Sequence, residues 1–252
     1  MEPEIFSLEV AKKSLDEEGF IRLNDLELGN DISQMQQRGF PFWSEDGLDF
    51  CRKHVLADER IRSILKSWFG ERCILVHWLR YTANPGHVIC FRRGGPEAGR
   101  RRLMVHLMAR GSQVVYWSRS HLQKLLWLET EYRYYEIPAP TLVNAGLKGE
   151  DLEFKDSHLR AIVDARLGLE LKQGYAIAFV FATEDALNRL PPMFLPNLPT
   201  LKQKVRDEME SPDIGVNFAF GKTASGTSQI TKSSSDSRPK TPDRNTPSGA
   251  SS

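Results

Sequence analysis

The chain has 252 residues, and its 34 Lys and Arg almost balance its 33 Asp and Glu, for a formal net charge of +1. This balance gives no global attraction to nucleic acid or to an acidic surface, so nucleic acid is not an expected partner. No apolar run approaches the roughly 18 residues of a membrane span, so no membrane partner is expected either.

The cysteines bear on the cellular compartment. Cys51, Cys73 and Cys90 are odd in number and widely spaced, which predicts reduced thiols and neither a disulfide framework nor a CxxC zinc site. The opening segment lacks the apolar core of a signal peptide. We therefore expect a cytoplasmic or nuclear protein, and the pattern leaves the oligomeric state open.

The N-terminal part of the chain is predicted to be largely helical. An amphipathic helix is expected over residues 7–18, a strand over 20–23 and a second helical region over 47–69. Gly19 and Gly70 follow the two helices, at positions where a left-handed residue commonly ends a helix.

Strand patterns dominate the middle of the chain. The expected strands cover residues 73–79, 87–91, 103–108, 113–117, 132–137, 167–171 and 175–182. An amphipathic helix over 198–209 closes this part of the chain. Helices followed by many strands with turn residues between them predict a β-barrel or sandwich with helices on the outside.

The composition divides the chain into one domain, residues 1–220, and a tail, residues 221–252. Ser and Thr supply 14 of the 32 tail residues, and Ile230 is the only large apolar one. Such a segment cannot bury enough surface to offset its conformational entropy, so a disordered tail is predicted.

Three segments, taken in order, form a series. They are Asp16 to Leu23, where a helix runs into a strand; Gly111 to His121 (GSQVVYWSRSH); and Lys172 to Phe179 (KQGYAIAF). Together they resemble the phytanoyl-CoA dioxygenase family of Fe(II)/2-oxoglutarate oxygenases, with Arg119 where that family has Gly. The resemblance spans residues 8 to about 185. It implies a mostly β, α+β fold: a double-stranded β-helix (jelly-roll or cupin-like) with N-terminal helices.

In that family a His-x-Asp pair and a distal His hold the metal. None of the six His here is followed two residues later by Asp or Glu, and position 89, two residues after His87, is Ile. The segment after the strand predicted to start at Tyr175, where the resemblance places the distal His, contains no His. The resemblance therefore implies a degenerate member. No metal ligand is assigned and no cofactor is expected. Fe(II) and 2-oxoglutarate would bind only if the iron had an unusual ligand set, for which Glu184 and Asp185 are the first candidate carboxylates.

Two histidines are the candidate catalytic residues. His87 is either a general base or retained ligand inside a barrel, or a strand residue that hydrogen-bonds to a neighbour. His121 either points into a pocket or follows a Ser-rich turn that caps a helix over residues 122–128. His106 lies inside an apolar strand, which is typical of a core histidine.

Arg92, Arg93, Trp117 and Arg119 are the candidate substrate-binding residues. Arg92 and Arg93 begin an arginine-rich loop that ends at Arg102. This loop either binds a phosphate, a CoA tail or nucleic acid, or is a solvated basic loop. Trp117 and the nearby aromatic residues either line an apolar small-molecule pocket or belong to the core.

Two classes of function follow. The first is a dioxygenase-like protein without an intact iron site, a pseudo-oxygenase or a metal-free biosynthetic enzyme, which binds or transforms a lipophilic small molecule such as a secondary-metabolite intermediate. The alternative is a non-enzymatic interaction protein that uses the Arg92–Arg102 loop and phosphorylatable Thr-Pro sites in the tail. An iron oxygenase with an unusual ligand set is a third hypothesis.

Overall fold

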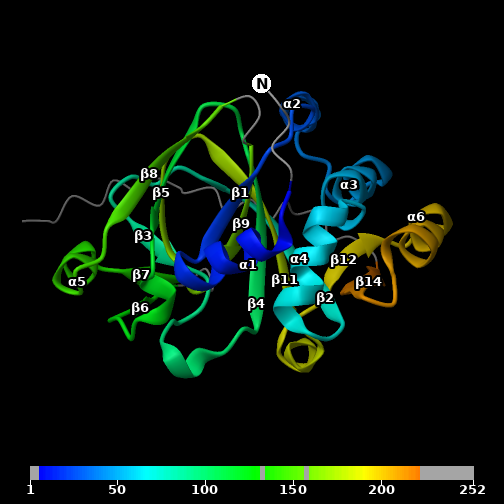
Figure 1. Ribbon diagram of the computed structural model, residues 1–252. Helices are drawn as coiled ribbons and strands as arrows, with labels where there is room; N and C mark the ends of the chain where they lie inside the picture. Colours follow the sequence, from blue (N-terminus) through cyan, green and yellow to red (C-terminus); the bar gives the residue numbers. More distant parts are fainter. Residues whose placement is uncertain (1–5, 131–133, 156–158, 222–252) are drawn as a thin grey trace, which may run out of the picture.

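The structure, a computed structural model, describes residues 6–130, 134–155 and 159–221 (Figure 1). The helices are α1 (Leu8–Glu17), α2 (Leu28–Gln37), α3 (Glu45–Cys51), α4 (Glu59–Phe69), α5 (Ala139–Asn144) and α6 (Pro199–Lys204). A first six-stranded sheet contains β1 (Phe20–Leu23), β9 (Arg160–Asp164), β4 (Arg102–Met108), β11 (Tyr175–Thr183), β2 (Cys73–Thr82) and β13 (Ile214–Val216), in that order. A second contains β6 (Leu128–Glu129), β7 (Tyr135–Ile137), β3 (Val88–Cys90), β10 (Gly168–Gln173), β5 (Ser112–Trp117) and β8 (Gly149–Phe154). A separate parallel pair joins β12 (Met193–Pro196) and β14 (Phe218–Gly221).

The order of the strands defines the architecture. Strands β2, β3, β4 and β5 alternate between the two sheets, and β8, β9, β10 and β11 do so again. Neighbouring strands pair antiparallel in both sheets, except that β13 runs parallel to β2. This winding produces a double-stranded β-helix, so the predicted fold class is confirmed.

Local sequence signals explain the N-terminal helices. The Ser7 hydroxyl caps α1, and the carboxylate of Asp58 caps α4 by accepting from the backbone N–H groups of its first turn. Gly19 and Gly70 adopt φ of +90° and +69° after these helices, as predicted from their positions. At Gly19 the space is also restricted, because a Cβ would lie 2.6 Å from Nδ1 of His121.

Helices α1 and α4 cover the outer face of the first sheet. Helix α1 contacts β1 and β9, and α4 contacts α1 and β2, which places both helices against that sheet (Figure 1). A buried ion cluster connects this sheet to helix α4. Arg160 of β9 donates a hydrogen bond to Asp25 at 2.6 Å and another to Asp58, the capping residue of α4. No helix in the described ranges is long and apolar enough to cross a membrane.

The helix predicted over residues 122–128 is wrong. Residues Ser120–Leu122 form a single 3-10 turn, the backbone is extended at Gln123, and Leu128–Glu129 is strand β6. Leu125 is buried in a small second core with Val88, Cys90, Ile137 and Leu142. Burial of Leu125 in this core requires an extended segment, so tertiary packing overrides the local helical pattern.

Several elements had no sequence prediction, namely α2, α5, β8, β9, β13 and the pair β12 and β14. The closing helix appears as α6, which continues as a wider π-helical turn over Val205–Met209. Of the predicted disordered tail, Gly221 ends β14, and the remaining residues, 222–252, lie outside the described residues.

Candidate functional site

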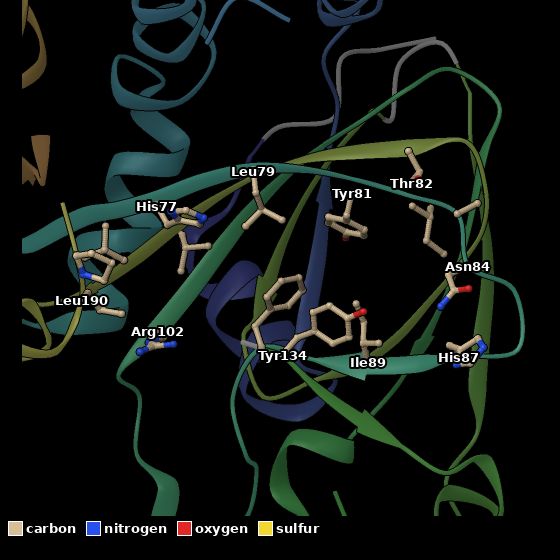
Figure 2. Close-up of a pocket in the computed structure, with 16 residues that line it drawn as sticks. His77, Leu79, Tyr81, Thr82, Asn84, His87, Ile89, Arg102, Tyr134 and Leu190 are labelled. Atoms are coloured by element: carbon tan, nitrogen blue, oxygen red, sulfur yellow. The ribbon is translucent and has the colours of Figure 1, made fainter. Parts of the chain in front are cut away.

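A cavity of about 190 Å³ lies between the two sheets (Figure 2). Strands β2, β4 and β11 of the first sheet and β3 and β10 of the second contribute to its walls. Most of the lining is hydrocarbon: Val76, Leu79, Ala83, Ile89, Phe91, Leu171, Val180, Leu190 and Pro191. Six residues add polar groups: His77, Tyr81, Thr82, Asn84, His87 and Arg102, with Tyr134 as a further aromatic wall.

The alternation of strand β2 explains why these side chains face inward. His77, Leu79 and Tyr81 all line the cavity, as expected for every second residue of a strand. Trp78 points to the opposite face, where the centroid of its ring lies 5.7 Å from that of Phe179. The apolar pattern of β2 therefore builds two different environments, a helix-covered core and a cavity wall.

His87 and Asn84 occupy one end of the cavity, just before β3 (Figure 2). Nδ1 of His87 lies 2.8 Å from Oε1 of Glu136 in the adjacent strand β7. A carboxylate accepts hydrogen bonds only, so a neutral His87 carries its proton on Nδ1 and presents an unprotonated Nε2. This orientation is the one that a general base requires.

Arg102 and His77 lie toward the other end of the cavity (Figure 2). The Arg102 side chain is half-buried, and burial lowers the pKa of its guanidinium. The cavity is thus an apolar space with a cation near one end and an oriented imidazole at the other.

The buried His106 lies next to Tyr81 of the cavity wall and to a second tyrosine, Tyr116. The hydroxyl of Tyr81 is 3.4 Å from the ring nitrogens of His106, and the hydroxyl of Tyr116 is 3.3 Å from Nδ1. Burial lowers the pKa of His106 to about 3 and raises the pKa of both tyrosines. All three groups are therefore neutral, and His106 is a core histidine.

His121 lies elsewhere. It is buried against Gly19, and its Nε2 is 3.3 Å from the carbonyl oxygen of Asp16 at the end of α1. Burial also lowers the pKa of His121. The structure therefore does not bring His87 and His121 together in the cavity.

The four candidate substrate-binding residues also lie outside the cavity lining. Arg92 donates to carbonyl groups of its own loop, including Gly99 at 2.9 Å, and Arg93 stacks 4.9 Å above the ring of Tyr135. Trp117 packs against the small second core, and Arg119 is a left-handed residue whose N–H donates to Glu18. These side chains therefore belong to the protein surface or to the second core, and not to the cavity.

The arginine-rich loop does not present its guanidinium groups as one cluster. Arg100 pairs with Asp16, and Arg101 lies 3.4 Å from Asp185. Arg93 contacts Tyr135, while Arg102 turns into the cavity. The arginines of the loop therefore contact different neighbours. This arrangement does not support a single phosphate-binding site formed by the loop.

The residues around His87 do not fit the iron site of the resembled family. The cavity side chains of Ile89 on β3 and Leu171 on the adjacent strand β10, which lie beside His87, carry no metal donor. The nearest carboxylate, that of Glu136, bonds to Nδ1 of His87, and Asn84 offers only an amide. Glu184 and Asp185, the first alternative carboxylates, pair instead with Arg72 and Arg101. Within the described ranges, no group of three or more His, Cys, Asp or Glu is arranged to hold a metal ion.

The chain matches no family model and no curated protein. Among solved structures it is similar to AviO1 from Streptomyces viridochromogenes Tue57, with 11% identity over 75% of this chain and 98% of that chain and a TM-score of 0.46. It is also similar to HygX from Streptomyces hygroscopicus with iron bound, with 14% identity over 71% and 88% of the two chains and a TM-score of 0.48.

A third similar structure is the epimerase SnoN in complex with Fe3+, alpha ketoglutarate and nogalamycin RO, with 11% identity over 69% and 83% of the two chains and a TM-score of 0.48. SnoN is a non-heme alpha ketoglutarate dependent enzyme. Similarity at this level assigns no activity to this chain. Membership of the phytanoyl-CoA dioxygenase family therefore stays a prediction.

Several site residues were missed by the sequence analysis. The sequence placed Asn84 in a turn, and His77 and Glu136 in predicted strands, but it did not indicate that any of them belongs to a site. The alternation of His77, Leu79 and Tyr81 in β2 was the available signal for an inward-facing polar group.

Proposed function

We propose that this chain binds a lipophilic small molecule in the cavity between its sheets, and that His87 exchanges a proton with it without an iron centre. The observation that carries the proposal is an apolar cavity that has, at one end, an imidazole oriented by Glu136. Apolar cavities of roughly this size hold molecules such as benzene. The ligand is expected to be a one-ring aromatic molecule or a short aliphatic chain.

The chemistry that these side chains support is acid–base. Nε2 of His87 accepts a proton from an acidic O–H or C–H group, and the electron pair of that bond stays on the ligand. Glu136 stabilises the imidazolium that forms, because its carboxylate lies beside Nδ1. In the reverse direction, the imidazolium returns the proton from Nε2.

Binding is tested with 3-phenylpropan-1-ol, a neutral probe of suitable size, by isothermal titration calorimetry. Ala83 lines the cavity, so Ala83→Trp fills part of its volume. We expect this change to lower the affinity by at least about tenfold. The matched control is Val143→Trp on helix α5, where the side chain is 62% exposed and lies outside the cavity lining.

The control variant is expected to bind the probe as the wild type does. Circular dichroism and a melting curve establish that both variants are folded. The proposed binding function fails if the wild type does not bind the probe, or if both tryptophan variants bind it equally well.

A further inference from the structure

Arg102 is directed into the barrel by its position at the start of β4. It pairs with Ala182 of β11, and it shares a face of the sheet with Met104 and His106. His106 is fully buried beside Tyr81, which lines the cavity. The same strand face therefore carries the Arg102 side chain to the cavity wall.

Other internal and loop arginines have carboxylate partners, and Arg102 differs from them in this respect. Arg160 is paired with Asp25, Arg166 with Asp164 and Arg100 with Asp16. The described residues offer the guanidinium of Arg102 no carboxylate and no hydrogen-bond acceptor. Burial is the main cause of its lowered pKa, and Tyr135 opposes that shift.

The surroundings of Arg102 add to its need for a counter-charge. Arg101 and Arg102 both act electrostatically on the nearby guanidinium of Arg92 and lower its pKa, although burial is the main cause of that shift. The cavity wall toward the Arg102 end is partly hydrocarbon and includes Leu190 (Figure 2). A half-buried cation in such surroundings is unfavourable until an anion joins it.

We propose that the ligand of this cavity is a carboxylic acid whose carboxylate pairs with Arg102 while its apolar body fills the space toward His87. This inference rests on the proposed binding function and names its ligand class. A planar carboxylate matches the two parallel N–H groups of a guanidinium. One guanidinium that has no carboxylate partner among the described residues balances one negative charge, which favours a monoanion.

The test compares two probes of nearly the same shape, 3-phenylpropanoate and 3-phenylpropan-1-ol, by calorimetry at fixed salt and neutral pH. The wild type is expected to bind the acid about tenfold more tightly than the alcohol. Arg102→Met is expected to abolish this preference and to leave the affinity for the alcohol within about twofold.

Arg101→Met is the matched control. Arg101 is the preceding residue, its side chain is 59% exposed, and it pairs with Asp185 outside the cavity lining. This variant is expected to keep the full preference for the acid. Arg102→Lys keeps the positive charge but loses the two parallel N–H groups of the guanidinium, so it should retain only part of the preference for the acid. This variant also tests the role of Arg102 if Arg102→Met does not fold.

Each contrary result is distinct. Equal binding of the two probes by the wild type overturns the ligand class and leaves the binding function intact. A preference for the acid that survives in Arg102→Met, or that is undiminished in Arg102→Lys, overturns the role of Arg102. Failure of the wild type to bind either probe overturns the binding function and this inference with it.

Discussion

Nδ1 of His87 lies 2.8 Å from Oε1 of Glu136, although 49 residues separate the two in the chain. Strands β3 and β7 pair antiparallel, with Ile89 opposite Glu136 and Val88 opposite Ile137. Glu136 therefore shares a face of the sheet with Ile89 and is the diagonal neighbour of His87 on that face. This register orients the imidazole at the cavity.

The first prediction concerns the tautomer of His87. In the wild type at about pH 8.5, the neutral imidazole should carry its proton on Nδ1, because Glu136 only accepts hydrogen bonds. Glu136→Gln offers an amide donor as well, so the population should shift toward the Nε2–H tautomer. Two-dimensional ¹H–¹⁵N NMR of the histidine side chains distinguishes the two forms. An Nε2–H tautomer in the wild type would contradict the assigned geometry.

A second prediction concerns the pH dependence of stability. Burial lowers the folded-state pKa of His106 to about 3, whereas an unfolded histidine has a pKa of about 6.5. Between these values the unfolded chain binds a proton that the folded chain does not, so this residue makes the folded state less stable as the pH falls below about 6.5. The slope approaches about 1.4 kcal/mol per pH unit.

His106→Phe removes this contribution, so urea denaturation between about pH 6.5 and 4.5 should show a shallower slope than in the wild type. The pKa values of His54 and His121 are also lowered, mainly by burial, so part of the slope should remain. Because slopes are compared, an overall loss of stability in the variant does not affect the test. Identical slopes would show that His106 is protonated without penalty.

A third prediction uses two left-handed glycines. Gly19 has φ of +90°, and a Cβ there would meet His121 and Leu167 within 2.7 Å, whereas Gly39 has φ of +72° and open space around it. Gly39→Ala should cost about 1 kcal/mol through backbone strain alone. Gly19→Ala adds a steric clash in a packed core, and should cost about 3 kcal/mol or more. Equal losses in denaturant titrations would show that His121 does not restrict this site.

The fold was predictable where a pattern extends over enough residues. Helix α1 and strands β2 and β11 have long periodic patterns, and Gly19 and Gly70 mark the helix ends. Strand β9 (Arg160–Asp164) has charged residues at both ends and only three apolar residues between them, so its strand signal is weak. Those charges are explained by tertiary partners, since Arg160 pairs with Asp25 and Asp58.

The candidate site was predictable only in part. His87 was identified from its place before a strand, but its partner Glu136 depends on the register of β3 and β7, which no local pattern specifies. His121 followed a Ser-rich turn, yet the structure buries it against Gly19. Arg102 was grouped with the loop arginines, because the direction of its side chain depends on where β4 begins.

The central claim, a cavity that works without iron, is tested most directly by metal analysis. Purified wild-type protein is incubated anaerobically with Fe(II) and 2-oxoglutarate, passed through a desalting column and analysed for iron. Position 89 is Ile, and no group of three His, Cys, Asp or Glu among the described residues is arranged to hold a metal, so we predict iron far below one atom per chain. One tightly held iron per chain, with turnover of 2-oxoglutarate, would contradict the claim.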